Sequence, residues 1–137
     1  MIYLDNNATT PVAPEVLEEM LPFLRDHYAN PSGMYTLAAE VGRRVTQARE
    51  QVAALLGAHP DEIIFTSCGT ESDNTAIRAA LESNPDRRGV VTTRVEHPAV
   101  KNLCEHLQHA GHPVHFLSVD ERGRLDLDQV RAAMTRT

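Results

Sequence analysis

The sequence predicts an α/β fold with a mainly parallel sheet covered by helices. Short apolar runs, typical of buried strands, alternate with longer segments in which apolar residues recur every three or four positions. Gly and Pro residues fall where these segments begin or end. Hydrophobic residues make up 42% of the 137 residues, which is enough for a folded core. Alternation of this kind is typical of layered α/β proteins.

Two helices are predicted in the N-terminal part. The first begins near Pro14, and because Pro22 lies within its apolar pattern we expect a kink or an early end there. Residues 30–33, Asn-Pro-Ser-Gly, are predicted to form a loop. A longer helix follows and stops at Gly57. Its apolar positions are Leu37, Val41, Val45, Ala48, Val52, Leu55 and Leu56.

Three short strands are predicted in the rest of the chain, at residues 62–66, 90–93 and 114–119. Residues 67–70 form a tight turn into a helix after the first strand, and Pro98 opens a helix after the second. A three-stranded parallel sheet is small and leaves open edges and uncovered apolar faces. We therefore expect an incomplete domain with exposed apolar area.

The C-terminal part is predicted to contain a turn and one more helix. The turn lies at residues 121–124, and Asp126 is the predicted N-cap of the helix that follows. The chain stops just after this helix, where a further strand is expected. This is a second reason to expect an incomplete domain.

Composition excludes several classes of function. The net charge is -6, with 19 acidic and 13 basic residues, which argues against a nucleic-acid partner. No apolar run is long enough to span a membrane, and the N-terminus has no signal-peptide pattern, so neither a membrane partner nor export is expected. Cys68 and Cys104 are isolated thiols, which indicates a reducing, cytoplasmic location.

Four histidines at every third position superficially resemble a metal-binding tract. They are His106, His109, His112 and His115. Gly111 is predicted to end the helix before His112, and His115 falls on a strand, so the four side chains do not converge. We expect no metal site.

The segment Thr66–Asn74 carries the strongest chemical signal. A small-residue turn leads into a helix, whose free N–H groups and dipole favour an anion. Gly69 allows close approach of a ligand, and Thr70 adds a hydroxyl donor, which together suit one phosphate group. The alternative is purely structural: Thr70 and Asp73 can form a capping box without any ligand.

The string Phe65–Asn74 closely resembles the phosphate-binding turn of the cysteine desulfurases, which use pyridoxal 5'-phosphate (PLP) and belong to the class V aminotransferase family. Four other strings resemble the same family, in the same order. They are residues 3–10, 30–32, 95–100 and 123–127. The amino acids at residues 5–7 and 67–70 most resemble those of the NifS branch, which serves nitrogenase in nitrogen fixation.

The resemblance implies the type I PLP-dependent transferase fold. Residues 1–12 would then lie with the small domain, and residues 13–137 would form the N-terminal portion of the large PLP-binding domain, left incomplete. The fold also implies that the predicted strand near residues 63–66 does not pair with the two strands that follow it.

The resemblance implies an activity and partners for the complete enzyme. It takes sulfur from L-cysteine, gives L-alanine and leaves a persulfide on its own cysteine, for iron–sulfur cluster or nitrogenase cofactor assembly. It works as a homodimer and passes sulfur to an iron–sulfur scaffold protein. Two alternatives stay open: another class V enzyme, such as a selenocysteine lyase, or a non-catalytic remnant that acts only as a binding partner.

Carried over to this sequence, the resemblance assigns the PLP phosphate to Gly69 and Thr70. It places His97 on the face of the PLP ring, where an imidazole can stack and take part in proton transfer. Without the resemblance, His97 is simply a helix-start residue before Pro98. Cys68 is predicted to be a small packed residue of the cofactor turn and not the sulfur carrier.

The family's remaining catalytic groups fall beyond residue 137. A PLP enzyme needs a lysine to hold the cofactor, and Lys101, the only lysine here, is not at the family's position. The sulfur-accepting cysteine also lies downstream, so we expect the isolated chain to be inactive. Within the chain, Tyr35 stands where the family usually has histidine, and Gly33 replaces a commoner serine. The role of that loop is left open.

Overall fold

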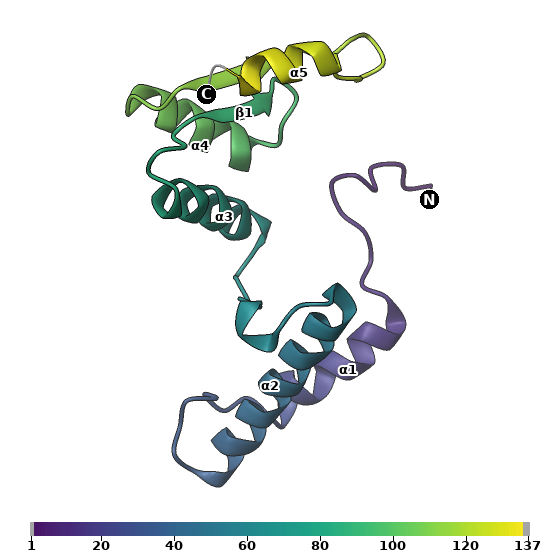
Figure 1. The fold of residues 1–137 in the computed structure, drawn as a ribbon. Coiled ribbons are helices and arrows are strands. Elements are labelled where there is room, and N and C mark those ends of the chain that lie inside the picture. Colours follow the sequence, from purple (N-terminus) through teal and green to yellow (C-terminus); the bar gives the residue numbers. More distant parts are fainter. Residues whose placement is uncertain (1, 136–137) are drawn as a thin grey trace. The chain divides into compact units, whose positions relative to one another are not determined.

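A computed structural model describes residues 2–135 of the chain. The structure divides into two compact units, the first ending at Ile64 and the second beginning at Phe65. Each unit is described by itself (Figure 1). The domain boundary expected after residue 12 is a separate matter and stays a prediction.

The first unit is helical. After an irregular segment come α1 (Pro14–Arg25), α2 (Thr36–Leu56) and the short 3-10 helix η1 (Pro60–Glu62). The N-terminal helices and the loop at residues 30–33 are confirmed, and in the loop the Ser32 N–H donates to Asn30 Oδ1 at 3.0 Å. Gly57 ends α2 as predicted, because it adopts the left-handed conformation with φ 67°.

The expected early end of the first helix at Pro22 is wrong. α1 continues through Pro22 to Arg25. Proline removes only its own N–H donor, and its carbonyl remains available. In α1 the Pro22 carbonyl accepts from the N–H groups of Asp26 and His27 at 2.8 and 2.9 Å, so the last turn is closed beyond the proline.

The predicted buried strand at residues 62–66 is also not formed. Glu62 belongs to η1, and Ile63–Thr66 has no regular structure. Ile64 is 74% exposed and Phe65 is 49% exposed. A strand needs a partner for its N–H and C=O groups, and neither sheet strand among residues 2–135 pairs with this segment. The family fold implied this lack of pairing with the two later strands.

The second unit is an α/β layer, as predicted. It contains α3 (Gly69–Ser83), β1 (Val90–Thr93), α4 (Pro98–His109), β2 (Val114–Leu117) and α5 (Leu127–Met134). The two strands are parallel, in a register that runs from Val90 opposite Val114 to Thr93 opposite Leu117. Because parallel strands need a crossover, α4 connects them in a βαβ unit.

The core of the second unit forms around α4. Leu103, Cys104 and Leu107 are buried and cluster with Val114 of β2. Cys104 is fully buried within α4. Asp126 caps α5 as predicted, since its Oδ1 accepts from the Asp128 N–H at 2.9 Å.

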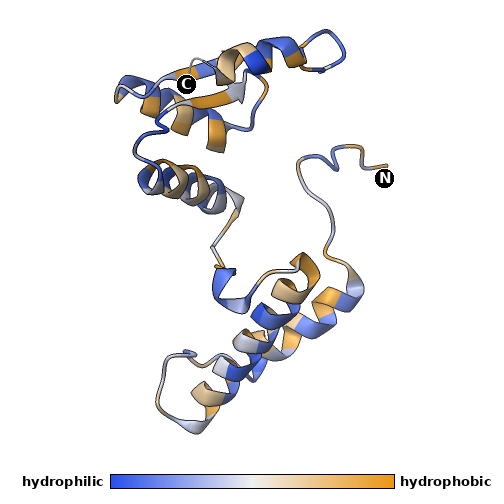
Figure 2. Ribbon diagram, in the orientation of Figure 1, coloured by the Kyte–Doolittle hydropathy of each residue, from blue (hydrophilic) through white to orange (hydrophobic). Residues whose placement is uncertain are grey.

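The expected exposure of apolar side chains is confirmed. α1 has no buried residue, although it has a clear apolar face (Figure 2). The large apolar side chains of α1 that are exposed to solvent are Val16, Leu17, Met20, Leu21, Phe23 and Leu24. Such a face is typical of a surface that packs against further protein. None of the helices described between residues 2 and 135 has the length and apolarity needed to cross a membrane.

Candidate cofactor site

The turn before α3 leaves hydrogen-bond donors open to solvent. Cys68 is the N-cap, and the first backbone bond of the helix runs from the Ser72 N–H to the Cys68 carbonyl at 3.1 Å. Between residues 2 and 135, neither the Gly69 N–H nor the Thr70 hydroxyl has a hydrogen-bond partner. Both residues are exposed. The start of α3 therefore offers a backbone donor, a hydroxyl donor and the positive end of a helix dipole to an anion.

The chain itself does not require glycine at position 69. Its φ is not positive, unlike that of three other glycines. A Cβ built on Gly69 would meet no heavy atom within 4 Å. The absence of a side chain at Gly69 thus leaves open space directly beside the Gly69 N–H, which fits the close approach of a phosphate group.

Glu71 has the wrong charge for a phosphate site, and it is held by Ser67. One carboxylate oxygen accepts from both the backbone N–H and the hydroxyl of Ser67, each at 2.6 Å. The Ser67 hydroxyl and then its N–H lower the pKa of Glu71. These two donors therefore stabilise the ionised Glu71 carboxylate and tie it to Ser67.

The predicted capping-box alternative is wrong. Cys68, and not Thr70, is the N-cap of α3, and the Thr70 hydroxyl has no partner among the described residues. Thr70 lies inside the first turn, so its hydroxyl is not placed to cap the N–H groups of that turn. This leaves the hydroxyl available to a ligand.

Cys68 is exposed, and the prediction that it is packed is wrong. Nothing in the described part of the second unit covers this turn. The backbone N–H of Glu71 contributes most to lowering the pKa of the Cys68 thiol, followed by the Ser67 hydroxyl and the Thr70 N–H. These donors favour the thiolate form of Cys68 over the thiol.

His97 is the N-cap of α4. Its Nδ1 accepts a hydrogen bond from the Ala99 N–H at 3.1 Å. In the neutral ring this bond requires an unprotonated Nδ1, so the proton lies on Nε2. The helix-start role predicted from Pro98 is thus present, and it orients an exposed imidazole whose faces remain available for stacking.

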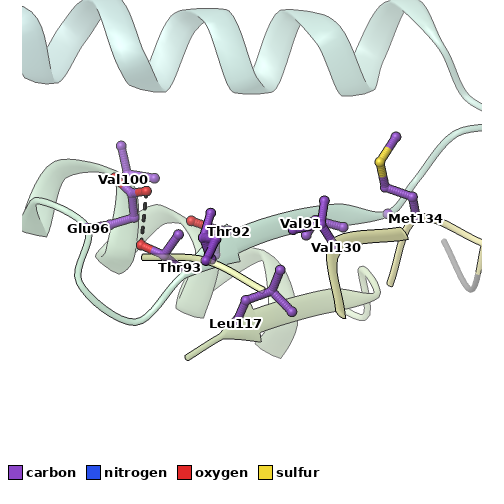
Figure 3. A pocket seen from close by; sticks show the side chains of 10 residues that line it. Val91, Thr92, Thr93, Glu96, Val100, Leu117, Val130 and Met134 are labelled. Carbon is purple, nitrogen blue, oxygen red and sulfur yellow. Dashed lines mark hydrogen bonds between the residues drawn. The ribbon is translucent and has the colours of Figure 1, made fainter. Parts of the chain in front are cut away.

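The turn that leads from β1 to His97 is closed by side chains. The Thr93 hydroxyl donates to Glu96 Oε1 at 3.1 Å (Figure 3). The same hydroxyl accepts from the Val95 N–H at 3.3 Å. This places His97 just beyond the carboxyl end of β1, the edge where parallel sheets usually bind ligands.

An apolar hollow of about 630 Å³ lies beside β1 (Figure 3). Apolar side chains from β1, β2, α4 and α5 line it, including those of Val91, Leu117, Val100 and Met134. Neither the open donors of α3 nor His97 lies in this hollow. Its lining is typical of a packing surface and offers no anion site.

The structure brings the starts of α3 and α4 together. The two helices contact each other. A side-chain bond links the two helices near their starts, from Asn74 Nδ2 in the second turn of α3 to the Ala99 carbonyl in the first turn of α4 at 3.2 Å. The predicted phosphate residues and His97 therefore belong to one linked pair of helix starts. Sequence reasoning missed Asn74, because its two bonding partners include a residue 25 positions away.

The loop at residues 30–35 is tightly packed at Gly33. A Cβ on Gly33 would lie 2.7 Å from Tyr35 Cε1 and 2.9 Å from Ala38 Cβ. Both distances are shorter than real contacts allow, so a serine at position 33 would require its neighbours to shift. Gly33 thus suits this conformation of the loop.

The remaining candidates are surface groups with local partners. Lys101 pairs with Glu105 on α4 at 3.8 Å. His109 and His112 bond through Nδ1 to the carbonyls of Glu105 and Arg88, at 2.7 and 3.1 Å. Residues 2–135 contain no group of three or more His, Cys, Asp or Glu side chains placed to hold a metal ion.

Comparison with known proteins identifies the family. The family described as aminotransferase class-V matches residues 2–137. A Trichormus azollae protein named cysteine desulfurase is 58% identical over 135 residues, which cover 98% of this chain and 34% of that protein. The Azotobacter vinelandii protein named cysteine desulfurase NifS is 51% identical over 135 residues, with the same coverage of both chains.

Solved structures agree with these relatives. One described as a NifS-like protein has a TM-score of 0.85 and 41% identity, and the match covers 96% of this chain and 36% of that one. Another, described as SspA in complex with cysteine, has a TM-score of 0.83 and 38% identity over 96% of this chain and 38% of that one.

The chain spans about a third of the length of the curated relatives it matches. The fold class and the NifS-type resemblance predicted from the sequence are both confirmed. The chain belongs to the class-V aminotransferase family, and it matches part of a NifS-type cysteine desulfurase.

Proposed function

We propose that this chain is the N-terminal, PLP-phosphate-binding part of a cysteine desulfurase. The observation that carries the proposal is a pair of donors at the open start of α3, the Gly69 N–H and the Thr70 hydroxyl, which have no hydrogen-bond partner among residues 2–135. These are the two residues to which the family resemblance assigns the cofactor phosphate. The sequence identity of this chain to NifS-type relatives supports the same function.

The complete enzyme would transfer sulfur from L-cysteine to its own thiol. The carbon–sulfur bond of cysteine breaks, a sulfur–sulfur bond forms on the protein, and L-alanine leaves with a hydrogen where sulfur was. When bound, PLP supplies the electron sink that this bond cleavage needs. The persulfide would then pass to an iron–sulfur scaffold protein for cluster or nitrogenase cofactor assembly. Homodimeric assembly and a cytoplasmic location belong to this proposal.

In this proposal the residues of this chain bind the phosphate of the cofactor and orient its ring. The Gly69 N–H and the Thr70 hydroxyl donate hydrogen bonds to a phosphate, and the α3 dipole favours its charge. His97, fixed through Nδ1 on the Ala99 N–H, presents the faces of its ring and holds a proton at Nε2. The first group anchors one end of a ligand and the second covers its ring.

A chimera tests the proposal. Residues 1–137 are joined to the remaining two thirds of the Trichormus azollae relative, and we call this chimera the completed protein. It is expected to retain PLP and to release sulfide from L-cysteine in the presence of a thiol. Thr70→Val should weaken PLP binding by about tenfold to a hundredfold, because one hydrogen bond to a charged group is lost.

Thr75→Val is the matched control, since Thr75 is also an exposed threonine of α3 and lies more than a helical turn farther along. It should leave PLP affinity unchanged. Equal PLP affinity of the two variants would remove Thr70 from the site. Turnover of another amino acid in place of L-cysteine would replace the proposed substrate.

A further inference from the structure

Asn74 makes two side-chain hydrogen bonds that join α3 to α4. Its Nδ2 donates to the Thr70 carbonyl at 2.9 Å and to the Ala99 carbonyl at 3.2 Å. The residue is half-buried, in the second turn of α3. Both acceptors are carbonyl oxygens, so only the NH₂ end of the amide, which carries two hydrogens, satisfies them.

The two bonded carbonyls connect Asn74 to both predicted parts of the site. Thr70 carries the open hydroxyl in the first turn of α3. Ala99 lies in the first turn of α4, and its N–H donates to His97 Nδ1 at 3.1 Å. Hydrogen bonds therefore join Thr70 to Ala99 through Asn74, and the backbone of Ala99 itself connects this carbonyl to the N–H that bonds His97 Nδ1.

A bond from Asn to the carbonyl four residues before it is common on helices and carries no function by itself. Asn84, at the end of α3, donates in this way to the Ala80 carbonyl at 2.9 Å. Asn84 makes no second side-chain bond among the described residues. The bond to Ala99 is what distinguishes Asn74, because it joins two separate helix starts.

We infer that Asn74 is a positioning residue, which sets the first turn of α4, and with it His97, relative to the phosphate-binding turn of α3. The inference rests on the proposed function for the ligand. It needs no contact between Asn74 and the cofactor. Asn74 acts through Thr70 and Ala99, whose second carbonyl lone pairs it uses.

The test compares Asn74→Asp with Asn84→Asp in the completed protein. Aspartate keeps the shape of asparagine but has no N–H to donate at neutral pH. Asn74→Asp should weaken PLP binding about tenfold, as expected for two lost hydrogen bonds, and Asn84→Asp should leave it unchanged. The Ala99 N–H should exchange with solvent about tenfold faster in Asn74→Asp only, because its turn is released.

If Asn74 had a purely structural role, the effects of its substitution and of His97→Ala on PLP affinity would be independent. We expect His97→Ala to lower PLP affinity, and Asn74→Asp to add much less than tenfold to that loss, because Asn74 acts through His97. If the carboxylate of Asn74→Asp prevents folding beside two carbonyls, Asn74→Ala and Asn84→Ala form the second pair, with the same expectations.

The outcomes separate this inference from the proposed function. A completed protein that binds no PLP overturns the proposed function, and the positioning role falls with it. A completed protein that binds PLP, with equal affinity in the Asn74 and Asn84 variants, overturns the positioning role alone. Unchanged Ala99 exchange in the Asn74 variants overturns it as well.

Discussion

The starts of α3 and α4 lie in the same unit and have the same backbone polarity, yet they differ in what they offer a ligand. At α3 the Cys68 side chain makes no capping hydrogen bond, and the Gly69 N–H has no partner within the described part of the chain. At α4 Pro98 has no N–H, and His97 satisfies the N–H of Ala99. A helix dipole alone therefore does not define an anion site, because the residues at the cap decide whether donors remain free.

The largest expected effect concerns the thiol at the open helix start. The isolated 137-residue chain, with added PLP and a thiol, should release no sulfide from L-cysteine above background, because the family resemblance places the cofactor-holding lysine and the sulfur-accepting cysteine beyond residue 137 and not at Lys101 or Cys68. Sulfide production is measured with Cys68→Ser as the control. Release that exceeds this control would make the start of α3 a catalytic centre.

Phosphate-free pyridoxal sharpens the comparison between the two helix starts. In the completed protein, Thr70→Val should reduce the affinity for PLP about tenfold to a hundredfold and leave that for pyridoxal unchanged. His97→Ala should reduce both affinities, because the ring is common to both ligands. Binding titrations of both compounds to both variants measure this. Loss of pyridoxal affinity in Thr70→Val would mean that the two starts are not functionally distinct.

Thiol labelling reports on how open the start of α3 is. Cys68 is exposed and its pKa is lowered, so more of it is thiolate at neutral pH, whereas burial raises the pKa of Cys104. In the completed protein without PLP, iodoacetamide should label Cys68 at least about tenfold faster than Cys104. Peptide mass spectrometry measures the two labelling rates. Added PLP should slow the labelling of Cys68. Equal rates with and without PLP would place the ligand elsewhere.

The smallest expected effect is a pH dependence at the start of α3. Hydrogen bonds from Ser67 lower the pKa of Glu71 in the folded chain. The stabilisation of the folded state by ionised Glu71 is therefore fully present above the pKa that Glu71 has in the unfolded chain. It is lost as pH falls through the lower pKa of Glu71 in the folded chain. The amide NMR signal of Ser67 in the completed protein should shift in that acidic range, and Glu71→Gln should remove the shift. A signal that titrates identically in Glu71→Gln would assign the change to another group.

Much of the second unit could be predicted from the sequence. The strands at β1 and β2, the helix opening at Pro98 and the cap at Asp126 all follow from local patterns and were confirmed. Local patterns suffice there because α4 buries its apolar face against the adjacent strands, whose partners are close in sequence. The phosphate-binding roles of Gly69 and Thr70, and the ring-facing role of His97, stay predictions.

Two of the errors, the strand at residues 62–66 and the packing of Cys68, share one cause. An apolar run at Ile63–Phe65 predicts a strand, but a strand exists only where another strand pairs with it. Cys68 was expected to be packed, but packing requires a neighbour that the described second unit does not place there. Periodicity and composition describe how a segment behaves when partners are present, and they do not supply the partners.

The sequence by itself determined where α2 ends, that α3 opens with a small-residue turn, and which family the chain resembles. These features depend on residues close together in the chain, such as the glycine after α2. Only the tertiary structure decided that the first turns of α3 and α4 are joined. The bond from Asn74 to the Ala99 carbonyl spans 25 positions, and no local pattern specifies it, because it arises from the packing of the two helices.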